Sequence, residues 1–385
     1  MNDAAPPPDG DPTSRQLSGY APDGSPVLSV ITKRTYTLNF NGRLTKAPQE
    51  LPLVVEPVVD DDGAELIEDS DLYPWKPFTD VVLRGHAYSD RPVFEYQVGI
   101  GVGDGGKMLA VRGPRRCQRL ANRGLKFTSV EPVDKVALSY KNAFGGRDKA
   151  AEAQHGTHLD ELAKYMPSVD LSTASPYIYP RNPIGVGYVV EETAETFDDF
   201  ALPMLEDPEH FLTPERLIAG SPARWAVMPL PWATGWMDVA AFPRSAYLGA
   251  FPEMDPATLP LAEIKRGFAA NNLLKPGGIM DQFDFRLTNG GALGLQFPYL
   301  LPGAAMFLGG LHRTVPRLRF TLPDEEPKLW IDGRNGKLVK TKPVIHTARI
   351  APDDHVVAIT WRGAAPALRP YGDEELARMP FKVQW

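Results

Sequence analysis

The stretch that most constrains how this chain can fold is residues 76–115. Three runs within it, residues 80–88, 93–102 and 107–111, are of strand length and either alternate apolar and polar side chains or stay apolar throughout. The short links between the runs are rich in Gly, Ser, Asp and Pro, which favour turns. The stretch therefore predicts a β-meander within a β-rich body.

Proline sets the second constraint, because the chain of 385 residues contains 39 prolines and 34 glycines. Proline breaks helix interiors and is poorly tolerated in central strands, so many short strands and long ordered loops are expected. We predict a mainly β protein with two packed β-sheet regions, sandwich- or barrel-like, joined by a loop-rich and proline-rich middle. Helical patterns are confined to residues 149–165 and to short turns such as residues 214–219.

The predicted domain organisation has three parts. Residues 1–25 lack the basic and apolar regions of a secretory signal peptide and are interpreted as a disordered tail. Residues 26–224 form a β-rich region with its loop-rich connection, and they open with an alternating run that ends at the hairpin signal Asn41-Gly42. Residues 225–385 form a second β-rich region, either a separate domain or packed into the first.

Charge and cysteine content limit the partners and the compartment. The net charge of -7 argues against nucleic acid and against an anionic membrane surface, since both attract clustered Lys and Arg. The single cysteine, Cys117, excludes an intramolecular disulfide and fits a reducing compartment, so a cytoplasmic location is predicted. Its arginine neighbours could activate the thiol, but an unpartnered cysteine is more often structural.

Motifs for cofactors and metals fail on their context. The residues from Gly101 to Lys107 match the first seven positions of a phosphate-binding loop, but Met108 stands where Ser or Thr is needed and a strand follows instead of a helix. We interpret them as a hairpin turn. His155, His158 and Asp160 could share one helical turn, yet no further ligand is recognisable. The sequence therefore predicts no cofactor, no metal and no catalytic residue.

The longest uncharged run, residues 290–311, has the length of a membrane span. Its prolines and glycines disfavour a continuous helix, so no membrane partner is predicted. The run belongs either to the core or to an exposed apolar surface. In the second case the expected partner-binding residues are aromatic or Met side chains, which are enriched at interfaces: Phe297, Tyr299, Met306 and Phe307.

Five motifs follow one another between residues 27 and 208. They are Thr32-Lys33-x-Thr35-Tyr36, Lys76-Pro77-x-Thr79-Asp80-Val81-x-x-x-Gly85-x-Ala87, Tyr140-x-x-Ala143-Phe144-Gly145-Gly146, Asn182-Pro183-x-Gly185-x-Gly187-Tyr188 and Leu202-Pro203-x-Leu205-Glu206-Asp207-Pro208. In this order they resemble the bacterial family called domain of unknown function 2169. The glycines suit positive φ and the X-Pro pairs suit extended turn entries, so these residues are expected to define the fold rather than a contact surface.

The resemblance implies a function without catalysis. Such proteins look like adaptor/chaperones that bind and stabilise an effector bearing a PAAR-like domain and help to load it onto the trimeric spike of the type VI secretion system. The predicted partners are therefore that effector and, as a second candidate, the spike protein. Edge strands and an apolar surface are compatible with this role.

Two alternatives come from other functional classes. A hydrolase or carbohydrate-active β-protein would use acidic and aromatic residues such as Asp238, Trp232 and Trp236 in a pocket with convergent polar groups. A structural component of the secretion apparatus would instead be incorporated into exported particles. A broad apolar or edge-strand surface distinguishes the adaptor from the enzyme.

Overall fold

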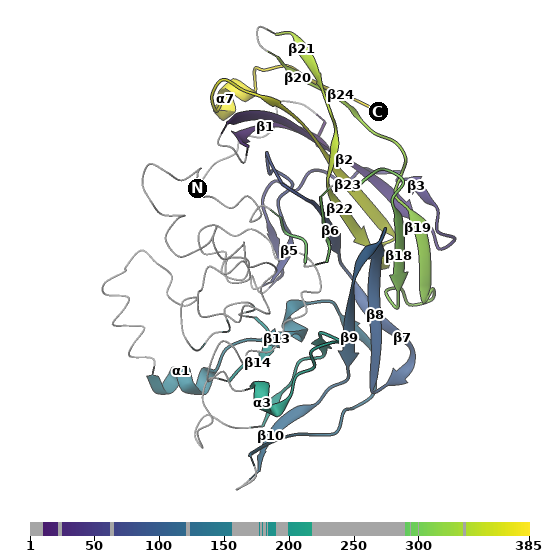
Figure 1. The fold of residues 1–385 in the computed structure, drawn as a ribbon, viewed down its shortest axis with the longest axis vertical. Helices are drawn as coiled ribbons and strands as arrows, with labels where there is room; N and C mark the ends of the chain where they lie inside the picture. The colour runs from purple at the N-terminus through teal and green to yellow at the C-terminus, as the bar shows by residue number, and fades with distance from the viewer. Residues whose placement is uncertain are drawn as a thin grey trace.

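A computed structural model describes a mainly β protein with few, short helices (Figure 1). The described residues are 11–21, 25–61, 65–120, 124–155, 177, 179, 182, 184–189, 199–217, 289–292, 294–298, 300–333 and 336–385. The fold class predicted from the sequence is confirmed. The barrel alternative is not found among the described strands, because the largest sheet is open and ends at β1 on one side and β17 on the other.

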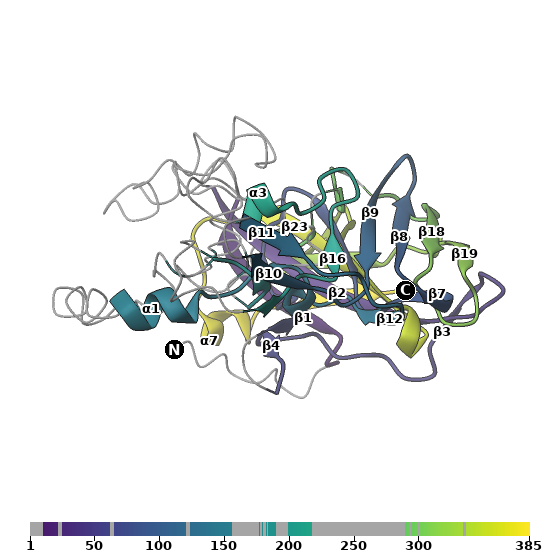
Figure 2. The same ribbon diagram turned by 90° about the horizontal axis from the view of Figure 1, so that it is seen from below.

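Two large sheets organise the molecule, and strands from distant parts of the chain alternate in both. The seven-stranded sheet has the order β1-β2-β23-β22-β6-β17, with β3 beside β2. Its strands are β1 (Ser14–Tyr20), β2 (Pro26–Leu38), β3 (Leu44–Lys46), β6 (Thr79–Leu83), β17 (Gln296–Phe297), β22 (Val344–Ala351) and β23 (Val356–Pro366). The five-stranded sheet contains, in order, β16 (Leu205–Glu206), β9 (Gly105–Arg112), β8 (Glu95–Val102), β18 (Ala305–Gly309) and β19 (Arg317–Thr321), and Figure 2 shows β9, β8, β18 and β19 in succession.

Smaller sheets and short helices complete the described structure. The remaining strands are β4 (Val58–Val59) with β5 (Leu66–Glu68), β7 (His86–Val93) with β12 (Val133–Ala137), β10 (Arg116–Leu120) with β11 (Gly124–Phe127) and β15 (Phe200–Ala201), β13 (Phe144–Gly145) with β14 (Val186–Gly187), and β20 (Lys328–Asp332) with β21 (Leu338–Thr341) and β24 (Phe381–Gln384). The helices are α1 (Lys149–His155), α3 (Pro214–Leu217) and α7 (Asp373–Leu376), with 3-10 turns η1 (Tyr140–Asn142) and η6 (Pro352–Asp354). No helix in these described ranges is long and apolar enough to cross a membrane.

The division at residues 224 and 225 does not separate two sheet regions. Strand β2 pairs with β23 from Val27↔Pro366 to Thr37↔Val356, so two strands from opposite halves of the sequence lie side by side (Figure 1). In the five-stranded sheet β18 likewise pairs with β8. The two predicted β-regions therefore share both sheets, and one main cluster of buried side chains draws on both.

The prediction of a disordered tail over residues 1–25 is wrong for part of that range. Strand β1 pairs antiparallel with β2, from Ser14↔Thr32 to Tyr20↔Pro26. Residues 1–10 lie outside the described structure. The short run of β1 predicts no strand by itself, because it is mostly polar and few of its residues favour a strand.

The predicted meander is right in its second half and wrong in its first. Strands β8 and β9 form the expected hairpin, with Val102↔Gly105 closest to the turn, so the interpretation of the phosphate-loop-like residues as a turn is confirmed. The first run breaks at Gly85, which has φ +150°. Strand β6 then pairs parallel with β22, whereas β7 pairs with β12. These partners are distant in sequence, so the local pattern could not reveal them.

Other local predictions fit the structure. The pair Asn41-Gly42 lies in the turn between β2 and β3, and Gly42 has the positive φ of +78° that favours glycine. The predicted helices begin at the expected residues in α1 and α3, although α1 is described only to His155.

Candidate functional site

Three of the five sequence motifs fold into one compact unit, because Leu205 of the fifth is bridged to Ala143 of the third, which in turn pairs with the fourth. Strand β13 pairs parallel with β14, which joins the Phe144-Gly145 motif to the Gly185-x-Gly187 motif. The buried side chain of Asn182 connects them further, because its Nδ2 donates to the carbonyl oxygens of Tyr140 at 2.8 Å and Phe144 at 3.1 Å. These motif residues therefore hold backbone segments together, which is the structural role expected from their composition.

Close packing explains the glycines of this unit. A Cβ atom on Gly146 would lie 2.3 Å from the carbonyl oxygen of Gly185, and Gly146 has φ +95°. Gly145 is equally crowded, since its Cβ would lie 2.2 Å from the carbonyl oxygen of Asn182. Only glycine allows these backbones to approach so closely.

We expect Gly146→Ala to destabilise the protein by more than about 1–3 kcal/mol, which is the usual cost of a sparsely populated backbone conformation. The steric overlap of the new Cβ atom adds to this cost. Gly103→Ala is the matched control, because Gly103 has φ +55° but open space around its Cβ position. Urea unfolding of both variants measures the difference. Equal losses of stability would show that the close approach to Gly185 is unimportant.

A buried ion pair fixes the fifth motif to the end of β9. The Arg115 guanidinium donates through Nη2 to Glu206 and through Nη1 to the carbonyl oxygen of Pro203 at 2.9 Å. The second carboxylate oxygen of Glu206 accepts from the backbone N–H of Leu212 at 2.5 Å. Burial lowers the pKa of Arg115, and the charge of Glu206 opposes this shift. The pair therefore connects the residues that follow β9 with β16 and with the residues that follow β16.

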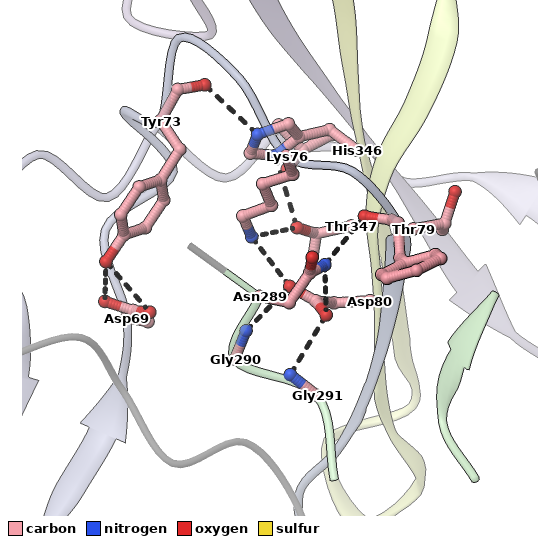
Figure 3. Close-up of polar contacts among 12 residues, drawn as sticks. Asp69, Tyr73, Lys76, Thr79, Asp80, Asn289, Gly290, Gly291, His346 and Thr347 are labelled. Atoms are coloured by element: carbon pink, nitrogen blue, oxygen red, sulfur yellow. Dashed lines mark hydrogen bonds and ion pairs between the residues drawn. The ribbon is translucent and has the colours of Figure 1, made fainter. Parts of the chain in front are cut away.

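The second motif forms the densest polar cluster, which we call the Lys76–Asp80 network (Figure 3). Both side chains are buried, and the Lys76 Nζ donates to Asp80 Oδ2 at 2.9 Å and to Thr347 Oγ1 at 3.1 Å. The Asp80 carboxylate also accepts from the backbone N–H groups of Gly290 at 2.9 Å and Gly291 at 3.0 Å. The side chain of Asn289 adds a bond to Asp80 Oδ1 at 2.9 Å. One carboxylate thus secures residues 289–291 against β6.

The network continues to a neutral histidine. His346 is buried and its Nε2 lies 3.1 Å from the carbonyl oxygen of Tyr73, which can only accept, so Nε2 carries the proton. Nδ1 then accepts from the Thr347 hydroxyl at 3.3 Å. Burial lowers the pKa of His346 well below its ordinary value, and the nearby positive charges of Lys76 and Arg362 lower it further. The imidazole is therefore a structural hydrogen-bonding group.

The two charged side chains of the network, Lys76 and Asp80, are paired with each other. Beside it lies a cavity of about 50 Å³, lined by Lys33, Asp71 and Thr360 as well as Lys76 and Asp80, which has room for a few water molecules. Lys33 and Asp71 form a buried ion pair in which Asp71 also accepts from Thr360 at 2.9 Å. Each of these charges has a counter-charge within the chain, so the cluster is suited to stabilising the fold rather than to transforming a substrate.

The predicted partner-binding residues occupy different environments. Met306 is buried in the main core at 2% exposure, whereas Phe297 and Phe307 are half-buried; Tyr299 lies outside the described residues. Phe307 stands opposite Gly101 of β8 and Arg319 of β19. An interface at this run would therefore rest on the two phenylalanines, and their part in binding stays a prediction.

A family of bacterial proteins matches this chain over most of its length. Residues 23–362 match the model of a family described as an uncharacterized protein conserved in bacteria, domain of unknown function 2169. The chain belongs to this family. The match continues past the five motifs and covers nearly all strands of both large sheets. Comparison with curated proteins and with solved structures finds no match.

Within this family member, the other sites raised by the sequence are structural or not described. Cys117 is fully buried in the main core, opposite Phe127 and Phe200. Among the described residues, no three His, Cys, Asp or Glu side chains are grouped to hold a metal ion. The side chain of His155, together with His158 and Asp160, lies outside the described structure, as do Asp238, Trp232 and Trp236.

Sequence reasoning missed two features that the structure reveals. The sequence does not indicate a role for Asn289, because its hydrogen-bond partner, Asp80, lies 209 positions away. The burial of Arg362 in β23, which is only 7% exposed, is the second feature that was not predicted. A lone arginine in a strand of apolar and Thr residues was the available signal, since buried Arg normally needs a partner.

Proposed function

We propose that this protein is a non-catalytic adaptor and chaperone that binds and stabilises a type VI secretion effector bearing a PAAR-like domain and helps to load it onto the trimeric spike. The resemblance of the five ordered motifs suggests the role, and binding would take place in the cytoplasm. The observation that carries the proposal is an uncovered apolar face on the five-stranded sheet.

Glycines form the floor of this face. In β8, Gly99 pairs with Met108 of β9 and with Gly309 of β18, and Gly101 pairs with Phe307. The long side chains lie down over the glycines: Met108 Sδ lies 2.2 Å from where a Cβ of Gly99 would be, and Phe307 Cε1 lies 3.2 Å from that of Gly309. We call this surface the glycine-floored face.

The glycine-floored face remains open to solvent in the described structure. Met108 is 50% exposed, and Phe307 borders a shallow hollow of about 510 Å³ together with Ala305, Gly103 and Arg319. The Arg319 guanidinium lies 5.6 Å from the Phe307 ring centre, so the rim carries positive charge beside an apolar centre. An apolar centre with a polar rim is the usual composition of a protein interface.

Phe307→Asp is expected to abolish capture of the PAAR-like effector while the variant keeps its fold. The reason is that a charge would be placed at the centre of the glycine-floored face, where binding would have to desolvate it. Co-expression of the two proteins followed by pull-down measures the complex, and circular dichroism checks the fold.

Leu368→Asp is the matched control, because Leu368 is also a large apolar residue, 67% exposed, but lies beyond β23 and away from this face. It should bind like the wild type. Retention of the complex by a folded Phe307→Asp would remove this face from the interface. Failure of the wild type to capture any PAAR-like effector would overturn the adaptor proposal itself.

A further inference from the structure

Arg362 is a buried cation whose charge nothing in the described chain balances. It is 7% exposed, forms no ion pair among the described residues, and its Nε and Nη1 are enclosed without an acceptor. Other buried cations of this protein have partners, as Lys33 has Asp71 and Lys76 has Asp80. An unpaired buried charge destabilises a folded protein by several kcal/mol. Such a charge therefore calls for an explanation, and binding of a ligand is one.

The surroundings of Arg362 indicate which kind of ligand its charge could bind. Its guanidinium stacks on Trp75, with Cζ 4.2 Å from the ring centre, which covers one face of the planar group. Because Nε and Nη1 are enclosed, Nη2 is the nitrogen left to meet an acceptor. The residue also lines a cavity of about 300 Å³ between residues 298–302 and 342–346. This volume is at the lower end of the range for small-ligand pockets.

The walls of this cavity, which we call the Arg362 cavity, select for one kind of ligand. They are largely apolar and include Pro298, Leu300, Leu301 and Pro343, with Leu301 68% exposed. Such walls provide few additional donors for a phosphate group, whereas a carboxylate needs only one guanidinium and is matched by it in shape and charge.

The other ionisable groups around the cavity leave a positive balance. Lys76 is neutralised by Asp80, and His346 is neutral. Lys342 and Glu326 are both exposed and carry opposite charges. The charge of Arg362 is therefore the one left over in the lining, and burial without a nearby carboxylate lowers its pKa to about 10, so it remains protonated at neutral pH.

We propose that the Arg362 cavity binds a carboxylate carried by an apolar residue, namely the C-terminal carboxylate of a polypeptide chain. A chain end fits a cavity of about 300 Å³ better than a crossing segment, which would need an entrance and an exit. The apolar walls take the last side chain and Arg362 takes the carboxylate. This site is separate from the glycine-floored face and does not depend on the effector role.

The test uses the full chain and a matched pair of probes: an acetylated tripeptide ending in leucine, as the free acid and as the C-terminal amide. Isothermal titration calorimetry should show binding of the acid and at least about tenfold weaker binding of the amide, the effect of losing one charge-assisted hydrogen bond. N-acetyl-leucine serves as a third probe, which should bind more weakly than the tripeptide acid. Tighter binding of N-acetyl-leucine would show that the cavity prefers a free small acid. That result would overturn the assignment to the end of a polypeptide chain.

Two variants assign the binding to Arg362. Arg362→Met should lose the preference for the acid and should melt no lower than the wild type, because it removes an uncompensated buried charge while keeping the length of the side chain. Arg362→Lys keeps a charge but not the planar fork, and it should bind the acid at least about tenfold more weakly. Equal affinity for acid and amide, unchanged binding by folded Arg362→Met, or no binding of any probe to the wild type would each overturn the proposal.

Discussion

Replacing Asp80 by alanine is expected to lower the free energy of unfolding by about 3–5 kcal/mol, the usual cost of removing one partner from a buried ion pair. Asp80 is 1% exposed and accepts from the Lys76 ammonium, from Asn289 and from two backbone N–H groups of residues 290 and 291. Its loss leaves a buried cation and several buried donors unsatisfied. Guanidinium chloride unfolding, followed by tryptophan fluorescence, measures the change.

A double variant separates the charge from the other bonds. Lys76→Met combined with Asp80→Leu removes both charges and should be less destabilised than Asp80→Ala alone, since no unpaired ammonium remains. The remaining loss would come from the freed N–H groups of residues 290 and 291. If Asp80→Ala lost less than about 1 kcal/mol, the typical value for an exposed ion pair, the network would not be buried as described.

The second large effect is expected for Glu206→Ala, again about 3–5 kcal/mol. Glu206 is 3% exposed, and its carboxylate accepts from Arg115 and from the backbone N–H of Leu212. Arg112 lies 3.6 Å away and is a weaker, partly exposed partner. Because Arg115 is itself buried at 4% exposure, it cannot turn to water when Glu206 is removed.

The same region supplies the control for this prediction. Glu95 pairs with Arg112 at 3.0 Å, but its side chain is 44% exposed, so Glu95→Ala should cost only about 0–1 kcal/mol. Chemical unfolding of both variants at one ionic strength gives the comparison. Similar losses for Glu206→Ala and Glu95→Ala would mean that burial does not strengthen the Arg115–Glu206 pair.

Local features of the fold were predictable because they depend on neighbouring residues. The turn at Asn41-Gly42, the β8–β9 hairpin and the starts of α1 and α3 each follow from a few adjacent side chains. The motif glycines were also predicted to be structural, and the crowding around Gly145 and Gly146 gives the reason. Predictions failed for the break between β6 and β7, which depends on distant partners, and for β1, whose mostly polar run pairs with the neighbouring strand β2.

By itself, the sequence determined that the chain is mainly β, that proline and glycine divide it into short strands, and that β2–β3 and β8–β9 form hairpins. Only the tertiary structure decided that β2 pairs with β23, that Asp80 secures residues 289–291, and that Arg362 is buried beside a cavity. The physical reason is the distance along the chain over which each interaction acts. Turn preference and side-chain alternation act over a few residues, whereas strand pairing and the balance of buried charges depend on which distant segments exclude water together.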